Sequence, residues 1–188
     1  MNQSKASEKI RFLTLTGVIA GLYTALTLLL APFSFGIVQC RVSEALTILA
    51  AYHPAAVAGL TLGCAISNLV GLTMGANTAG ALDILLGTLA TGLAAWASYG
   101  LRNFRFGGLP VLSTVPPVLF NALIIGTELT FVLGPVTLPT WLMWSGSVGL
   151  GQIIACVGGG LLIAYSFQKS GLDRKIQQDL NTNRRKPT

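Results

Sequence analysis

Residues 12–30 read FLTLTGVIAGLYTALTLLL and contain no charged side chain. A helix needs about 20 predominantly apolar residues to cross the hydrocarbon core of a bilayer, and this stretch is long enough. It is too long for the apolar core of a signal peptide, and we find no cleavage signal, so we expect the helix to be retained. The stretch predicts a membrane protein whose first spanning helix begins near the amino end.

The composition of the whole chain agrees with a lipid environment. The chain has 188 residues, of which 52% are hydrophobic and 10% are charged, and its mean hydropathy is +0.68. Soluble domains usually carry about 25% charged residues, so this chain could not cover a water-exposed surface with polar groups. Its length allows about six spans. Three scattered cysteines without CxxC spacing and a single histidine predict neither a disulfide framework nor a metal site.

Apolar stretches predict an all-α membrane bundle of six spanning helices. They cover residues 12–30, 41–52, 54–70, 78–101, 116–133 and 140–167. Because 41–52 is short for a span, the alternative is one kinked helix over the second and third stretches. Eleven of the twelve Lys and Arg residues lie near the amino end, in the loop 102–108 and in the carboxyl tail, and six spans place all three in the cytoplasm. We therefore expect two cytoplasmic termini, with a segment 1–11, a membrane domain 12–168 and a basic tail 169–188.

Four charged residues lie within or beside the predicted spans: Arg41, Glu44, Asp83 and Glu128. A charge at the centre of a bilayer costs about 2.5–3.5 kcal/mol, so such residues usually face a cavity or a partner. On the six-span topology they gather in the outer third of the membrane, which predicts an outward-facing polar binding cavity. The other candidates for this cavity are Asn68, Asn121, Trp141 and Trp144.

Each candidate has a structural alternative. Arg41 and Glu44 are three residues apart and could pair on a helix surface, and Asp83 could cap its helix or pair with Arg41. The two tryptophans could belong to an interfacial belt, and the two asparagines could join helices by hydrogen bonds. Glu128 has no obvious cation partner, which favours a functional role.

Small residues spaced four apart indicate two close helix contacts. One set is Gly17, Gly21 and Ala25, for which packing within the chain is the alternative to docking of a partner. The other set is Gly59 and Gly63, which we interpret as an internal contact.

Three motifs make the chain similar to a known family. Residues 39–46, QCRVSEAL, resemble the hallmark Q-x-R-x-S-E-A-L, and LFNA at 119–122 followed by GTE at 126–128 resembles a second signature. Asp83 followed by GTLAT at 87–91 is similar to the third. The family is QueT, whose members are substrate-binding S components of energy-coupling factor (ECF) transporters. Cys40 and the alanine-rich segment after His53 depart from the pattern, but neither touches the charged positions.

The resemblance implies six helices, no enzymatic activity and no cofactor in this chain, which lies in the cell membrane. The implied partners are two cytoplasmic ATPases, which use ATP, and a membrane scaffold subunit. By position, Gly17, Gly21 and Ala25 match the surface that docks on the scaffold, and the loop 32–39 is a candidate lid. The implied substrate is a queuosine precursor, a 7-deazaguanine such as 7-aminomethyl-7-deazaguanine or queuine.

The chemistry of a 7-deazaguanine suggests roles for the candidates. Its N1–H and 2-amino donors lie side by side and suit a carboxylate, for which Glu128 is our first choice and Asp83 the second. Stacking of the flat ring on an aromatic side chain is worth about 1–3 kcal/mol. The remaining candidates are Gln39, Arg41, Asn68 or Asn121 for O6, Glu44 for an aminomethyl cation, and Trp141 or Trp144 for stacking.

Other classes of function remain as alternatives. The chain could be an S component for another vitamin-like heterocycle or a stand-alone secondary carrier, although we find no internal repeat of the kind common in carriers. A membrane enzyme would need a nucleophile with a base or a metal cluster, and His53 alone supplies neither. Nucleic-acid binding would need a basic face with interleaved aromatics, which is absent from the sequence.

Overall fold

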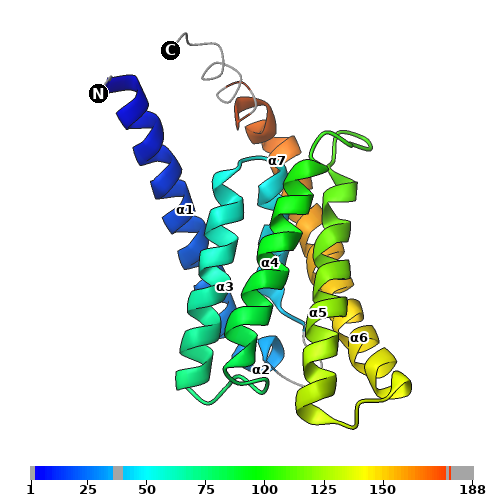
Figure 1. Cartoon of the computed structure of the whole chain (residues 1–188). Helices are drawn as coiled ribbons and strands as arrows, with labels where there is room; N and C mark the ends of the chain where they lie inside the picture. Colours follow the sequence, from blue (N-terminus) through cyan, green and yellow to red (C-terminus); the bar gives the residue numbers. More distant parts are fainter. Residues whose placement is uncertain (1–2, 36–39, 177, 179–188) are drawn as a thin grey trace.

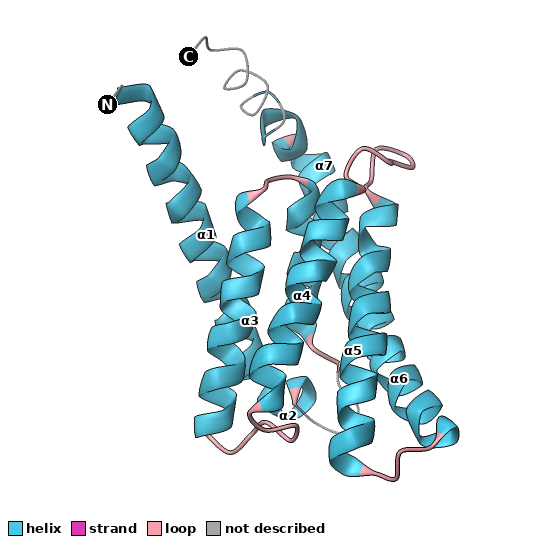
Figure 2. Ribbon diagram, viewed as in Figure 1, coloured by secondary structure: helices cyan, strands magenta, loops and turns pink. Residues whose placement is uncertain are grey.

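The computed structural model describes residues 3–35, 40–176 and 178, with side chains described from residue 6 onward. The described part is built from helices, which run up and down in one bundle (Figures 1 and 2). In chain order the helices are α1 (Gln3–Leu29), α2 (Ala31–Ser34), η1 (Val42–Ala51), α3 (Ala55–Thr73), α4 (Leu82–Gly100), η2 (Val111–Thr114), α5 (Val115–Leu133), α6 (Leu138–Gln152), η3 (Ile153–Gly159) and α7 (Gly160–Ser170). The predicted all-α class is thereby confirmed.

Five helical stretches are long and apolar enough to cross a membrane. They are Ala6–Leu29, Ala55–Thr73, Leu82–Gly100, Val111–Leu133 and Leu138–Ser170. The predicted count of six spans is not confirmed, because the stretch 41–52 forms the 10-residue 3-10 helix η1. At about 2.0 Å per residue this helix extends roughly 20 Å, whereas the hydrocarbon core is about 30 Å thick.

The short helix η1 lies inside the bundle, where it contacts α1, α3, α4, η3 and α7. Seven of its side chains are buried: Ser43, Glu44, Ala45, Thr47, Ile48, Ala50 and Ala51. Its close neighbour η3 is a π-helix, and Gly159 there makes room for Ala45. A Cβ atom added at Gly159 would lie 2.9 Å from the Ala45 Cβ atom. Polar side chains on η1 therefore point into protein rather than lipid.

Helices α1 and α3 pack closely because two glycines face α1. A Cβ atom added at Gly59 would lie 2.9 Å from the Ile19 Cβ atom, and one added at Gly63 would lie 2.9 Å from the Tyr23 Cβ atom. The internal contact predicted for this pair is thus confirmed. Gly17 and Gly21 have no atom within 4 Å of an added Cβ, so they do not serve packing within the described chain. Together with Ala25 they lie on the exposed face of α1.

The start of α1, the end of α7 and the loop between α4 and α5 lie at the same end of the bundle (Figure 1). The Gln168 side chain donates a hydrogen bond of 3.0 Å to the Gly107 carbonyl, which joins α7 to that loop. Because α1 begins at Gln3, the described residues of the predicted segment 1–11 continue the helix. The helix α7 ends at Ser170, where Gly171 adopts φ +68°. The basic regions of the described chain therefore share one end of the molecule.

Candidate functional site

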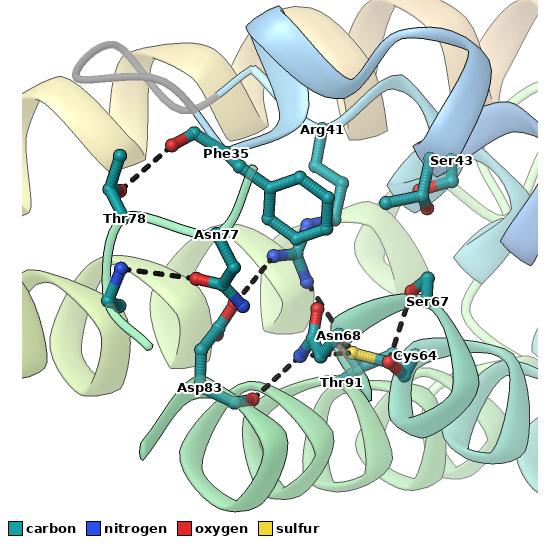
Figure 3. A network of polar contacts seen from close by, with 12 residues as sticks. Phe35, Arg41, Ser43, Cys64, Ser67, Asn68, Asn77, Thr78, Asp83 and Thr91 are labelled. Carbon is teal, nitrogen blue, oxygen red and sulfur yellow. Dashed lines mark hydrogen bonds and ion pairs between the residues drawn. The ribbon is translucent and has the colours of Figure 1, made fainter. Parts of the chain in front are cut away.

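A buried ion pair joins η1 to α4 near the end of the bundle opposite the termini (Figures 1 and 3). Arg41 precedes η1 and Asp83 lies in the first turn of α4. The Arg41 Nη2 atom lies 3.2 Å from Asp83 Oδ2, and the two side chains are 5% and 0% exposed. The guanidinium group also stands over the Phe35 ring, 5.3 Å from its centroid. Of the alternatives for Asp83, the structure contains the pairing with Arg41.

Two asparagines hold Asp83 in place. The Asn77 side chain donates a hydrogen bond of 3.0 Å to Asp83 Oδ2, and its own oxygen accepts one of 3.1 Å from the Ala79 backbone. The Asn68 side chain donates a bond of 2.6 Å to the Asp83 carbonyl. Gly87 leaves the space for this arrangement, since a Cβ atom there would collide with Asp83 Oδ1 and the Asn68 amide. Sequence reasoning missed Asn77, although an asparagine in a glycine-rich loop is a recognisable turn signal.

Cys64 lies at one side of this network, next to Asn68 and Thr91 (Figure 3). Its sulfur accepts a hydrogen bond of 3.5 Å from Arg41 Nη1 and lies 3.4 Å from the Thr91 hydroxyl oxygen. The Asn68 amide lies 3.6 Å from the same sulfur. Cys64 is a buried free thiol. Its contacts connect the ion pair to the deeper part of α4.

Glu44 has no direct part in the ion pair. Its carboxylate accepts hydrogen bonds from the hydroxyl groups of Tyr23 at 2.5 Å, Thr91 at 2.8 Å and Thr47 at 3.0 Å. The pairing of Arg41 with Glu44 that their spacing allowed is therefore replaced by the contact between Arg41 and Asp83. The physical reason is that η1 brings Arg41 to α4, whereas the Glu44 carboxylate points to hydroxyl groups on α1, α4 and η1 itself.

Glu128 is the most conspicuous group of the site because it is buried without a partner. Its side chain is 2% exposed, and neither carboxylate oxygen has a hydrogen-bond partner in the described structure. The charges of Asp83 and Arg41 both act on it, which places it in the same electrostatic neighbourhood. Among the described residues, the other buried side-chain atoms without hydrogen-bond partners include Ser34 Oγ, Asp83 Oδ1, Asn68 Oδ1, Thr88 Oγ1, Trp144 Nε1 and Ser145 Oγ.

The remaining candidates occupy varied positions. Trp144 is buried and packs with Ile125 and Leu129, which flank Glu128 on either side along α5. Trp141 donates its indole N–H to the Thr127 hydroxyl at 2.9 Å. Asn121 is buried and donates to the Pro117 carbonyl of its own helix at 2.9 Å. Gln39 and residues 36–38 of the predicted lid lie outside the described residues.

Helices long enough to span a membrane, around a buried set of charged and amide side chains, define a multi-pass membrane protein with an internal polar site. Solute transporters form such a class. The chain belongs to the QueT transporter family, whose model matches residues 13–169. It is 28% identical over 167 residues to the queuosine precursor transporter QueT of Lactococcus lactis subsp. cremoris (strain MG1363), across 84% of this chain and 92% of that protein. No solved structure matches the chain.

Proposed function

We propose that this chain captures a queuosine precursor, a 7-deazaguanine, as the substrate-binding component of an ECF importer in the cell membrane. The observation that supports this best is the Glu128 carboxylate, which is buried with both oxygens unpartnered in the described structure. Burying an unpartnered charged group is costly. A ligand that donates two hydrogen bonds to the carboxylate would remove most of that cost.

Buried polar atoms without partners on α3, α4, α5 and α6 suit the edge of a guanine-like base. The adjacent N1–H and 2-amino donors of the base fit the two oxygens of one carboxylate, with charge assistance. Asp83 Oδ1 and Asn68 Oδ1 are buried acceptors without partners among the described residues, and they suit further N–H groups of the ligand. The O6 atom of the base needs a donor, for which Trp144 Nε1 and Ser145 Oγ are available.

For the topology, we propose that η1 acts as a short sixth segment and that both termini face the cytoplasm. Support comes from the start of α1, the end of α7 and the basic loop of Arg102 and Arg105, which lie at one end of the bundle (Figure 1). Basic loops favour the cytoplasmic side. The polar site then lies toward the outer face, where an S component would collect its substrate.

For the partner, we propose that α1 docks on the scaffold subunit of an ECF module with two ATPases. Gly17, Gly21 and Ala25 leave one face of α1 free of side-chain bulk. In a bilayer, small residues at this spacing let another helix approach closely. ATP is used by the partner subunits in this arrangement, and the chain itself supplies only substrate binding.

The test is titration calorimetry of the purified chain with 7-aminomethyl-7-deazaguanine and with guanine as competitor. We expect a nanomolar Kd, or about −12 kcal/mol, for the wild type. Glu128→Gln removes the charge and one acceptor, so we expect binding about 100-fold weaker. Glu8→Gln changes an exposed carboxylate near the amino end and serves as the matched control.

Each outcome has a clear meaning. Absence of binding to folded wild-type protein would refute the 7-deazaguanine as substrate, and unchanged affinity of Glu128→Gln would refute the role of Glu128. Co-purification with two ATPases and a scaffold subunit tests the ECF assignment separately. Uptake by the chain in vesicles that lack those subunits would instead identify a stand-alone carrier.

A further inference from the structure

Glu44 is buried near the Arg41–Asp83 pair, and nearly all hydrogen-bond acceptor positions of its carboxylate are occupied. An ionised carboxylate offers about four acceptor positions. Three of them are occupied by the hydroxyl groups of Tyr23, Thr91 and Thr47, and the side chain is 0% exposed. In contrast to Glu128, this carboxylate has little remaining capacity for a ligand.

The three hydroxyl donors come from three different elements. Tyr23 lies on α1, Thr91 lies on α4, and Thr47 lies one turn along η1 from Glu44. A second contact, of 2.6 Å between the Thr27 and Ser43 hydroxyl groups, ties α1 to η1 beside the first. Through Glu44, therefore, η1 is fixed to a helix on each side.

This fixation extends to Arg41 by two routes. The backbone N–H of Glu44 donates a hydrogen bond of 2.9 Å to the Arg41 carbonyl, which closes the first turn of η1. Arg41 is the residue immediately before Val42, where η1 begins, so the placement of this first turn also sets where the Arg41 side chain starts. The second route is Cys64, whose sulfur accepts from Arg41 Nη1 and is in contact with the Thr91 hydroxyl at 3.4 Å.

We propose that Glu44 is a positioning residue for substrate binding and that Tyr23 and Thr91 act through it. Together they hold η1 in the rotation that directs Arg41 toward Asp83, and none of the three touches the substrate. This role differs from the contact with an aminomethyl cation that the sequence suggested for Glu44. The inference rests on the proposed function, because it takes Glu128 and Asp83, which pairs with Arg41, as groups that bind the substrate.

The experiment compares two ligands that differ in charge. We expect Tyr23→Phe, which removes the hydroxyl and keeps the ring, to weaken binding of 7-aminomethyl-7-deazaguanine about tenfold. Binding of the neutral 7-cyano-7-deazaguanine should weaken by the same factor, because Glu44 does not contact the charged group of the ligand. Glu44→Gln should weaken binding of both ligands to a similar extent. The double variant Tyr23→Phe with Glu44→Gln should bind only slightly more weakly than either single variant. Tyr165→Phe, on an exposed side chain, is the control and should bind as wild type.

Two results would overturn the proposal. One is wild-type affinity in Tyr23→Phe, and the other is a Glu44→Gln variant that loses the aminomethyl ligand while keeping the cyano ligand. If Glu44→Gln does not fold, Thr91→Val replaces it in the comparison. Binding is measured well below the unfolding temperature of every variant, so that unfolded protein does not lower the apparent affinity.

A second readout needs no ligand. Cys64 is 0% exposed between the two parts of the network, and a loosened η1 should let N-ethylmaleimide alkylate it faster in Tyr23→Phe than in Tyr165→Phe. Peptide mass spectrometry gives the rate for Cys64 alone. If wild-type protein binds neither ligand, the proposed function fails, and the Cys64 rate then decides whether Tyr23 and Glu44 hold η1 in place: an increase supports this and an unchanged rate refutes it.

Discussion

Removing either partner of the buried Arg41–Asp83 pair should destabilise the protein, but by unequal amounts. The Arg41→Met variant leaves the carboxylates of Asp83, Glu44 and Glu128 without the guanidinium group whose charge acts on all three. In Asp83→Asn the guanidinium group keeps the attraction of the other two carboxylates, and the new amide keeps an oxygen for Asn77. Loss of the cation should therefore be the more harmful change.

The magnitude follows from the burial of the pair. Breaking a buried ion pair from one side costs about 3–5 kcal/mol, because one charge remains without compensation. With exposures of 5% for Arg41 and 0% for Asp83, we expect about 5 kcal/mol for Arg41→Met and about 3 kcal/mol for Asp83→Asn. In a chain of this length 1 kcal/mol corresponds to roughly 2–4 °C in Tm. The two variants should thus differ by roughly 4–8 °C.

Thermal unfolding in detergent, followed by far-UV circular dichroism, measures both values. Arg174→Met removes an exposed cation beyond α7 and should leave Tm unchanged. Combining Arg41→Met with Asp83→Asn should recover part of the loss, since the double variant buries one charge fewer than Arg41→Met alone. Equal Tm values for the two single variants, or a more stable Arg41→Met, would refute the reasoning.

Two further predictions concern glycines. Gly87→Ala places a methyl group against Asp83 Oδ1 and should weaken both folding and substrate binding, whereas Gly146→Ala, with open space around it, should change neither; calorimetry and Tm of the two variants provide the comparison. Gly63→Leu should destabilise the fold by more than about 1–3 kcal/mol, because an added Cβ would lie 2.9 Å from α1. Gly17→Leu should fold and bind substrate normally, but it should abolish uptake in cells because the chain no longer docks on the scaffold subunit. Normal uptake by this variant would exclude that face of α1 as the docking surface.

Much of the site could be anticipated because charges are costly in apolar helices. Arg41, Asp83, Glu44 and Glu128 stood out in the sequence for that reason, and the structure finds all four buried. Neutral hydroxyl groups give no such signal, since they occur in many membrane helices at little cost. Tyr23 and the threonines that bind Glu44 were therefore missed, and the role suggested for Glu44 rested on its charge alone.

The membrane class, the helical architecture and the family follow from the sequence alone. These depend on local quantities, namely the transfer free energy of each stretch of about 20 residues and the order of residues within short motifs. The buried 3-10 helix within 41–52 and the pairing of Arg41 with Asp83 became known from the three-dimensional structure. Those outcomes depend on which helix faces meet, and the partners in such contacts lie tens of residues apart in the chain. No local pattern encodes that choice, because it is made by the packing of the whole bundle.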